Sequence, residues 1–578
     1  MNKKSLVALM AATSFFAVGC TSNSGTNTAQ KQLERIKADQ IGYQTNSVKI
    51  AVIPDGTSDD FQIVDLQGNV VYNNKTSQAA TWVSSGTSVK MADFSDFNKS
   101  GVYTIKCDGA EQSFPFAIGD NIYTDLAIAA IKSYYYARSG VEITSKNGGK
   151  YARPAAHPDT EVKIHKSAVG PKRKEGDIIS SPGGWYDAGD YNKYIVNSSI
   201  TVWEILNAVE LYPQYAQSLN TNIPESDNNI PDIVDELLFN LRWMITMQDP
   251  DDGGVYHKLT ALGFNGMIMP QDDHDERYVV KKSTAAALDL AATCAKAYRV
   301  LKPYDENLPG LRDSLMKVAE KAWNWAQKNP NVLYDKNPEG VMTGQYDDIY
   351  IRDEFTWAAL ELTLSTSDAK KYMKAINKED FDFATPAWDS SSVLGIMSVF
   401  NEKESERLFD TEMYNYMKDG FLKLADQYLG DYQRSPYATP LSVFPWGSNS
   451  VAANQGIVLA AAYRITGNTK YLEAAQADLH YILGRNPLDY CYVTGFGSKM
   501  VKDVHDRRSV ADGVEKPVSG YLCGGPNATA KGDIADSLYK YNTPAMRYCD
   551  INSSYTTNEI AINWNAALIG LVFEIDGK

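Results

Sequence analysis

Two aspartates three residues apart, Asp187 and Asp190, lie in the segment 183–191, which reads GGWYDAGDY. A glycine pair allows a tight turn and a close approach to a ligand, and aromatic rings offer flat faces to the apolar faces of sugars. A carboxylate can hold a water molecule and remove its proton. The segment therefore predicts hydrolysis of a carbohydrate with one carboxylate as the base. The alternative is that Asp190 only caps the helix that follows it.

Glu559 is the candidate for a complementary acid. It directly precedes apolar residues that recur at helical spacing over 560–571, which predicts a buried helix face. Desolvation beside such a face raises the pKa of a carboxyl group, whereas the helix dipole lowers it. The alternative is structural, because Thr556 and Glu559 have the spacing of a capping box.

Four further residues are candidates for contacts with the substrate: His257, Trp446, His505 and Arg507. The imidazole and guanidinium donors lie in glycine-rich loops, where they could bind sugar hydroxyls or a developing charge. The tryptophan lies in the segment PWGSN and could stack on a sugar ring. The alternatives are a solvated basic loop around residue 505 and core packing for the tryptophan.

The length and composition exclude several classes of protein. A chain of 578 residues is too long for one compact domain. Its net charge of -15 argues against binding to nucleic acid or to an anionic membrane surface, and fits a neutral ligand. The 36 Tyr and 10 Trp suit a sugar-binding cleft.

The cysteines give no metal motif. No CxxC pair occurs, which argues against a cysteine-rich zinc site. Five cysteines follow Cys20, so at least one thiol has no disulfide partner within the chain. Pairing among Cys491, Cys523 and Cys549 is left open.

The N-terminal residues predict a targeting signal. Two lysines are followed by an apolar run over 6–19, which is too short to span a bilayer permanently. The run ends in AVGC at 17–20, which resembles a bacterial lipoprotein signal. We therefore expect a cleaved signal over 1–19, lipid on Cys20 and a flexible tether over 20–35. The expected location is the bacterial cell envelope, at the outer membrane, with membrane contact only through this anchor. The alternative is an ordinary signal peptide.

Near residue 120 the spacing of apolar residues changes from that of strands to that of helices. Short alternating runs over 48–53, 61–65, 69–72 and 101–105 predict a small β-sandwich within residues 36–120. Residues 121–578 carry about twelve helical patterns, and their even number suggests a ring of helix pairs. No βαβ alternation occurs, so we expect no parallel sheet. The helices are expected at 122–138, 192–211, 231–247, 284–302, 310–328, 353–366, 368–376, 387–400, 404–428, 449–466, 469–484 and 557–573.

Three motifs together resemble glycoside hydrolase family 9, over residues 36–575. The segment 187–190 matches the family's water-binding and base pair, and the run 548–566 matches its C-terminal signature, whose glutamate is Glu559. The run 494–507 matches its histidine signature, although Cys491 stands where a small hydroxyl residue or Val is usual. The three matches occur in the family's order.

The resemblance implies an immunoglobulin-like domain followed by an (α/α)6 barrel that hydrolyses β-1,4-glucan with inversion. Asp190 would take a proton from water, Asp187 would help hold that water, and Glu559 would protonate the leaving oxygen. His257, His505 and Arg507 would line the subsites around the cut bond. We expect a monomeric endo-glucanase acting on cellulose or cello-oligosaccharides.

Other functions remain open on the same residues. The enzyme alternatives are an exo-acting glucosidase or glucosaminidase and a xyloglucanase. The alternative of another class is a non-catalytic glycan-binding lipoprotein, against which the intact carboxylates argue.

The resemblance also bears on metals. Related enzymes hold zinc through two Cys and two His, but the matching positions here read RSG at 138–140 and AAH at 155–157, with Lys193 after the base. We therefore expect no zinc. A family calcium site maps to Asp353, Glu354 and Asp389, and carboxylates suit that ion. The alternative is an acidic pair at a helix N-terminus.

Overall fold

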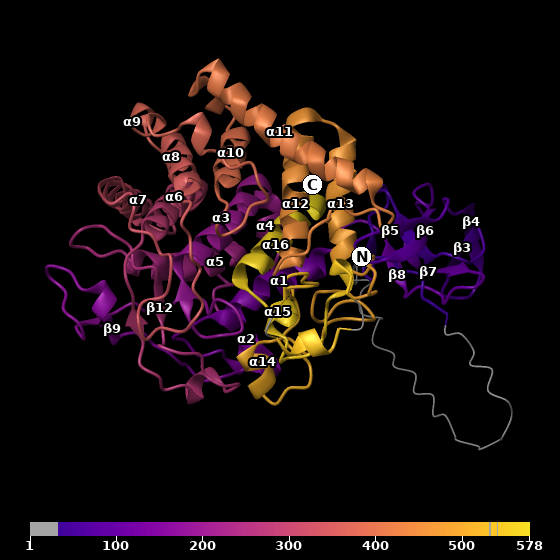
Figure 1. The fold of residues 1–578 in the computed structure, drawn as a ribbon, viewed down its shortest axis with the longest axis horizontal. Coiled ribbons are helices and arrows are strands. Elements are labelled where there is room, and N and C mark those ends of the chain that lie inside the picture. Colours follow the sequence, from indigo (N-terminus) through magenta and orange to yellow (C-terminus); the bar gives the residue numbers. More distant parts are fainter. Residues whose placement is uncertain (1–32, 531–532, 540–541, 578) are drawn as a thin grey trace.

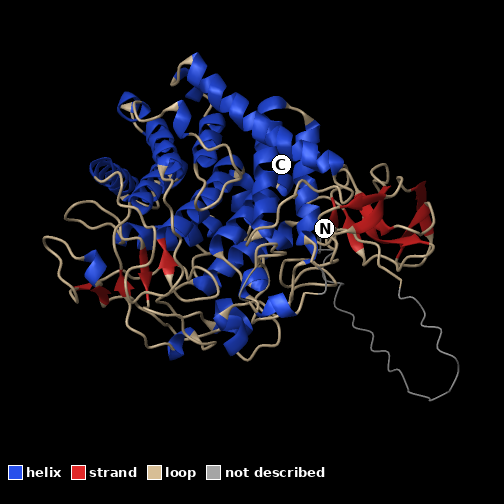
Figure 2. Cartoon of the chain, viewed as in Figure 1, coloured by secondary structure: helices blue, strands red, loops and turns tan. Residues whose placement is uncertain are grey.

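The computed structural model describes residues 33–530, 533–539 and 542–577. They form a β-domain beside a larger helical domain (Figures 1 and 2). Cys20 and the predicted signal and most of the tether lie outside the described residues. Within the described part of the chain, no helix has the length and apolar character needed to cross a membrane.

The β-domain consists of two sheets that enclose an apolar core. In β3, Phe61 and Ile63 belong to the core while Asp60 and Gln62 are exposed, which is the alternation of a strand with one buried face. The strands of the first sheet, in spatial order, are β1 (Gly42–Tyr43), β8 (Phe116–Ile118), β7 (Gly101–Cys107), β3 (Asp60–Asp65) and β4 (Val70–Lys75). The second sheet has β2 (Ile50–Pro54), β6 (Thr87–Asp93) and β5 (Ala80–Trp82).

Twelve helices of the second domain form an inner and an outer ring. The inner helices are buried on nearly all sides and pack on one another, as expected of helices that are apolar all round. They are α3 (Ile195–Leu211), α6 (Thr284–Val300), α8 (Arg352–Ser365), α10 (Ser392–Asn401), α12 (Ser448–Thr466) and α16 (Ile562–Asp576). The outer ones are α1 (Thr124–Ala137), α5 (Asp232–Thr246), α7 (Leu311–Lys328), α9 (Ala369–Met373), α11 (Thr411–Arg434) and α13 (Thr469–Ile482). The pairing of α1 with α16 closes the ring, and this is the (α/α)6 barrel that the resemblance implies.

The long loops carry structure that the sequence patterns did not predict. A small sheet has the order β10 (Ile178–Ile179), β9 (Val162–Ile164), β13 (Tyr278–Val279), β12 (Lys258–Thr260) and β11 (Lys193–Tyr194). Strands of two or three residues are too short to show a period. Strand β11 leads directly into α3, so this sheet fixes the chain that enters the barrel. Short helices α2 (Ser145–Gly148), α4 (Pro213–Ser218), α14 (Arg507–Ala511) and α15 (Tyr555–Asn558) complete the loops.

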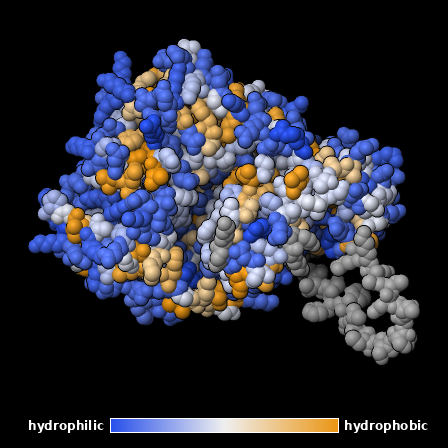
Figure 3. Space-filling view, viewed as in Figure 1, coloured by the Kyte–Doolittle hydropathy of each residue, from blue (hydrophilic) through white to orange (hydrophobic). Residues whose placement is uncertain are grey.

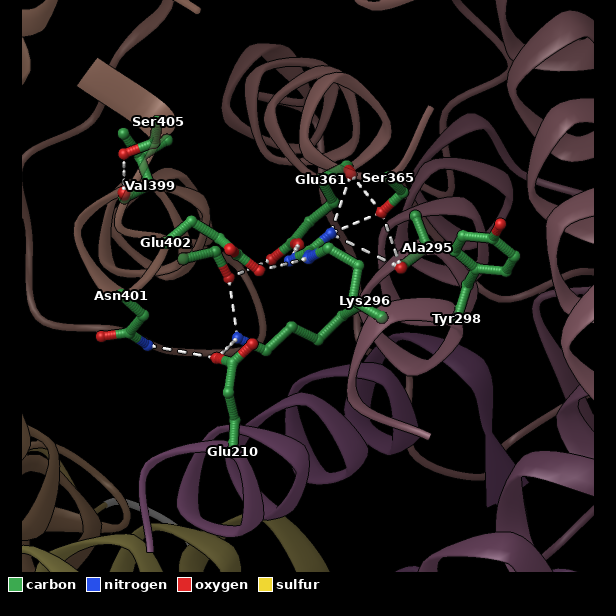
Figure 4. A network of polar contacts seen from close by, with 12 residues as sticks. Glu210, Ala295, Lys296, Tyr298, Glu361, Ser365, Val399, Asn401, Glu402 and Ser405 are labelled. Carbon is green, nitrogen blue, oxygen red and sulfur yellow. Dashed lines mark hydrogen bonds and ion pairs between the residues drawn. The ribbon is translucent and has the colours of Figure 1, made fainter. Parts of the chain in front are cut away.

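A buried ion network closes the end of the barrel where the inner helices finish (Figure 4). Lys296 of α6 pairs with Glu210 of α3 at 2.6 Å, and Arg299 pairs with Glu361 of α8 at 2.5 Å. Ser398 of α10 accepts a hydrogen bond from Lys296 and donates one to Glu361. Both cations lie in the last turns of α6, where the helix dipole favours positive charge.

The two domains share an apolar and polar interface. Trp82 packs against Tyr437 and Phe444 with ring centroids 4.9 and 6.0 Å away. Asp39 Oδ2 lies 2.8 Å from Nδ1 of His480, and both side chains are buried. The core of the helical domain continues into β2, β5 and β6. The molecular surface seen in Figure 3 is mostly hydrophilic with scattered apolar groups.

Two of the cysteines for which pairing was left open, Cys491 and Cys523, are buried as free thiols. They therefore form no disulfide with each other.

Candidate active site

A cavity of about 740 Å³ opens at the end of the barrel where the inner helices begin. It collects the residues just before α3, α10, α12 and α16, because these helices start at the same end of the ring. Six of the seven residues predicted to bind or cleave substrate line it. They are Asp187, Asp190, Trp446, His505, Arg507 and Glu559.

Asp187 is held by neutral donors. Its Oδ1 accepts a hydrogen bond from Asn197 Nδ2 at 2.7 Å, and its Oδ2 accepts one from the Tyr346 hydroxyl at 2.6 Å. Burial, followed by the negative charge of Asp190, raises the pKa of Asp187 to about 7. The carboxylate is fixed in place without a cationic partner, which leaves it free to hold a water.

Asp190 is not a helix cap. Helix α3 begins five residues later at Ile195, and the residue that precedes it makes no capping bond. The Oδ2 atom of Asp190 instead accepts hydrogen bonds from Asn192 Nδ2 and from the Tyr194 hydroxyl, the latter at 3.1 Å. Two donors to one oxygen fix the orientation of this carboxyl group, and a base needs a fixed orientation toward its water.

Glu559 lies between helices rather than in one. Helix α15 ends at Asn558 and α16 begins at Ile562, so Glu559 is extended with ψ of 159°. The capping box does not form, because the Thr556 hydroxyl donates to Asp533. Desolvation in the cleft, then the charges of Asp190 and Asp187, raise the pKa of Glu559 well above its usual range. A carboxyl group that stays protonated near neutral pH is suited to be an acid.

The segment 494–507 brings Glu559 against the segment 183–191. His505 and Glu559 form an isolated parallel bridge, and the His505 amide donates to the carbonyl of Asn558 at 2.8 Å. A side chain on Gly189 would come within 2.2 Å of the His505 carbonyl, so only glycine fits there. The Nδ1 atom of His505 lies 2.6 Å from the carbonyl oxygen of Asn552.

Arg507 lines the cavity, but most of its donors bind the protein. Its Nη1 donates to the carbonyl of Gly189 at 2.7 Å, while Nε and Nη2 donate to the carbonyl of Asn265. Arg507 therefore holds the segment 183–191 through Gly189, and its contact with substrate stays a prediction.

Aromatic rings form the walls of the cavity. Trp446 is 47% exposed, and its ring lies 5.6 Å from that of Tyr555. Trp388 also lines the cavity and packs edge-on against Tyr346 at 5.2 Å. Phe264, Tyr194 and Trp564 also line it. The sequence patterns did not assign Tyr194, Tyr346 or Asn197 to the site. Tyr194 and Asn197 fall within the helical pattern 192–211, and Tyr346 lies 159 residues from Asp187.

His257 lies behind the wall of the cavity and not in it, which corrects the prediction that it contacts substrate. Its ring is fully buried and stacks on Tyr334 at 3.7 Å. Its two ring nitrogens lie 2.9 Å from the Ser283 hydroxyl and 3.2 Å from the Gln345 carbonyl. Burial lowers its pKa to about 3, so it is a neutral support for the loop that carries Gln345 and Tyr346.

The positions that match a zinc site do not suit zinc. Lys193 Nζ lies 2.6 Å from Asp159 Oδ2, and Arg138 forms ion pairs with Glu225 and Glu236. His157 is the only residue there of a type that commonly binds zinc, and its ring contacts Tyr186 and Asp273. Two fixed cations and one imidazole do not make a zinc site.

The predicted calcium ligands lie near other buried carboxylates. Both oxygens of Glu354 and both of Asp289 are buried without a hydrogen-bond partner, and Asp353 accepts from the Ser391 amide at 2.7 Å. Such oxygens suit a hard cation. However, the described residues contain no group of three or more His, Cys, Asp or Glu arranged to hold a metal. Calcium at Asp353, Glu354 and Asp389 therefore stays a prediction.

Comparisons with known proteins show the family of the chain. The model for glycosyl hydrolase family 9 matches residues 123–572, and the model for a cellulase N-terminal Ig-like domain matches residues 31–112. The chain is 40% identical to a xyloglucan-specific endo-β-1,4-glucanase of Bacteroides ovatus, over 99% of this chain and 98% of that protein. It is 34% identical to endoglucanase D of Acetivibrio thermocellus, over 93% of this chain and 82% of that protein.

Solved structures give the same result. One described as Bacteroides ovatus GH9 superimposes with a TM-score of 0.87 at 39% identity, covering 94% of this chain and 98% of that chain. A metagenome-derived family 9 endoglucanase gives a TM-score of 0.85 at 31% identity, covering 94% of this chain and 99% of that chain.

Proposed function

Because this chain belongs to glycosyl hydrolase family 9 and is an endo-acting β-1,4-glucan hydrolase, we propose that it works with inversion through Asp190 and Glu559. The observation that supports the proposal is that three carboxyl groups share one cavity, and that none of the ion pairs among the described residues involves them. Carboxyl groups left without cations at a cleft are available for proton transfer.

In this mechanism Asp190 and Asp187 act on one side of the cut bond. Asp190 removes a proton from a water whose second hydrogen is held by Asp187, and the water oxygen bonds to the anomeric carbon. Glu559 gives its proton to the leaving glycosidic oxygen as that bond breaks. The proton gained by Asp190 and the proton lost by Glu559 balance, so exchange with solvent restores the enzyme.

The environments support this division of roles. Asp190 receives two hydrogen bonds to one oxygen. Glu559 is desolvated and lies near two negative charges, which raises its pKa and keeps its proton.

A substrate with an activated leaving group separates the two roles. Dinitrophenolate leaves without a proton, so Glu559→Gln should retain much of its kcat on dinitrophenyl cellobioside while losing activity on cellohexaose. Asp190→Ala should lose activity on both. Equal losses by both variants on both substrates would refute the assignment.

A second candidate is more specific: xyloglucan as the preferred substrate. It is supported by the 40% identity, over nearly the whole of both chains, to a protein named for that specificity. Comparing kcat/KM on xyloglucan, carboxymethyl-cellulose and cellohexaose tests it. A preference for unbranched glucan would reject xyloglucan specificity and leave the proposed mechanism intact.

Lipid anchoring at Cys20 belongs to the proposal. It is supported by the sequence AVGC at 17–20 after an apolar run. Partitioning of the wild type and Cys20→Ser between detergent and water tests it. The wild type should enter the detergent phase and the variant should not. Aqueous partitioning of both would refute the anchor, which bears on location at the outer membrane and not on catalysis.

A further inference from the structure

Four buried cations bind the backbone of residues 183–191, the base loop, which carries both aspartates. Each donates a hydrogen bond to a carbonyl oxygen of residues 183–191, at distances between 2.6 and 3.2 Å. The pairs are Lys193 with Gly183, Arg508 with Ala188, Arg507 with Gly189, and Arg277 with Tyr191.

Two of these cations share one buried counter-ion, Asp159. Its Oδ2 lies 2.6 Å from Lys193 Nζ and its Oδ1 lies 3.1 Å from Arg277 Nε. The side chains of Lys193 and Asp159 are fully buried, and that of Arg277 is 8% exposed. The triad Lys193–Asp159–Arg277 therefore holds the loop at Gly183, its first residue, and at Tyr191, its last.

The triad also reaches Asp190 through one intervening residue. Asn192 stands between Tyr191, whose carbonyl accepts from Arg277, and Lys193, a member of the triad. The amide of Asn192 donates to Asp190 Oδ2. The amide oxygen of Asn192 accepts from the Thr260 hydroxyl and the Ala261 amide, both at 2.9 Å. A shift of the backbone at 191–193 would therefore move a direct hydrogen-bond donor of Asp190.

The loop that supplies Asp159 is itself strained. His157 and Asp159 have φ of 50° and 49°, a region that side chains other than glycine rarely adopt. Such conformations persist only where the surroundings determine them. The Ser181 amide donates to the Asp159 carbonyl at 2.8 Å, so this loop is tied to the entry of the base loop.

We propose that the buried triad Lys193–Asp159–Arg277 positions the base loop. Lys193 stands at one of the positions where the resemblance puts zinc in related enzymes. The three are positioning residues, since they act through Asn192 and the loop backbone. The inference rests on the proposed role of Asp190 as the base.

Lys193→Met tests the proposal against a matched control, Lys296→Met. Both lysines are fully buried and each pairs with a carboxylate at 2.6 Å, but Lys296 lies in the network at the far end of the barrel. Lys193→Met should lower kcat on cellohexaose about 10- to 100-fold, because small displacements of a catalytic group cost that much. Its KM should stay within about twofold, since the aromatic walls are unchanged. Lys296→Met should lower the melting temperature and keep the wild-type kcat in its folded fraction.

Asp159→Asn provides the second variant if Lys193→Met does not fold, with the same expected split between kcat and KM. A folded variant with wild-type kcat would overturn the proposal, as would failure of both variants to fold, which would make the triad purely structural. A zinc content near one per protein in the wild type would also overturn it.

Asp190→Ala is assayed alongside these variants as a control for the proposed base. If it retains activity the proposed base is wrong, whereas its inactivation beside an active Lys193→Met rejects the positioning role alone.

Discussion

Acidic side chains are buried at both ends of the barrel, but their hydrogen-bond and ion-pair partners differ. Where the inner helices finish, Glu210 and Glu361 each have a cation within 2.6 Å (Figure 4). Where they begin, Asp187 accepts hydrogen bonds only from an amide and a hydroxyl. The side chains of Asp187 and Glu361 are both buried, so the difference lies in their partners.

That difference separates stability from catalysis. Pairing with Lys296 outweighs burial and lowers the pKa of Glu210, whereas burial beside Asp190 raises that of Asp187 to about 7. A buried pair is costly to break but inert. An unpaired carboxyl group carries a cost in the folded state and gains the ability to exchange protons near neutral pH.

The largest expected effect is on turnover. Asp190→Ala and Glu559→Gln should each lower kcat on cellohexaose by about 10²–10⁴-fold, the usual contribution of an acid or base. Their melting temperatures should stay near that of the wild type. Glu361→Gln is the matched control at the other end, and its folded fraction should turn over normally. Loss of kcat in a folded Glu361→Gln would break the comparison.

The second effect is on stability, and its sign should differ between the two ends. An acid whose pKa is raised by folding binds more protons folded than unfolded between about pH 4 and 7, so it lowers the free energy of unfolding as the pH rises through that range. Asp187→Asn removes this loss and should be at least as stable as the wild type at pH 7.5.

Glu361→Gln should instead lower the free energy of unfolding by about 3–5 kcal/mol, because Arg299 would remain buried without its partner. Denaturant unfolding at pH 5 and 7.5 measures both variants. Destabilisation of Asp187→Asn at pH 7.5 by as much as Glu361→Gln would show that the cleft carboxylates are structural.

A smaller effect is expected in the pH profile. The Tyr346 hydroxyl lowers the pKa of Asp187 by bonding its charged form. Tyr346→Phe should raise that pKa, so the acidic limb of kcat/KM moves up by about one pH unit, equivalent to one ordinary hydrogen bond. An unchanged limb would show that Asp187 does not need to be ionised.

The walls of the cleft should affect binding more than chemistry. Trp446→Ala removes a half-exposed ring from the cavity and should raise KM for cellohexaose by about 3- to 10-fold, the value of one aromatic contact. Its kcat should change by less than about threefold. A large loss of kcat with unchanged KM would mean that the ring acts only in the transition state.

The smallest effect concerns calcium. If Asp353, Glu354 and Asp389 bind it, 1 mM calcium should raise the melting temperature by a few degrees relative to chelator, through the linkage of binding to folding. Asp389→Asn should reduce that shift without changing kcat. Equal melting temperatures with and without calcium would reject the site.

Periodicity predicted the barrel well because nearly all inner and outer helices are long enough to show their period; α9, with five residues, is the exception. Pattern and helix coincide, for example, at 284–302 and α6 (Thr284–Val300), whereas the pattern at 404–428 precedes α11 (Thr411–Arg434) by several residues. The sheet in the loops was not predicted, since its strands are two or three residues long.

Motifs located the carboxyl groups that line the cavity but not their surroundings. The segments around Asp187 and Glu559 carry their chemistry locally, whereas Tyr346 meets Asp187 only through the fold. His257 shows the opposite failure. Its glycine-rich context resembles that of a binding loop, yet the ring is enclosed by Tyr334, Ser283 and Gln345. Burial of a single side chain depends on distant segments that no local pattern reports.

The configuration of the first product tests the central claim most directly. Cellohexaose is hydrolysed in deuterated buffer while the anomeric protons are followed by NMR, before mutarotation mixes the two forms. Direct attack by a water held between Asp187 and Asp190 predicts that the α-anomer appears first, with the carboxyl groups of Asp190 and Glu559 roughly 6.5–9.5 Å apart to admit that water. First appearance of the β-anomer would contradict the account, because it requires a covalent intermediate on a carboxylate.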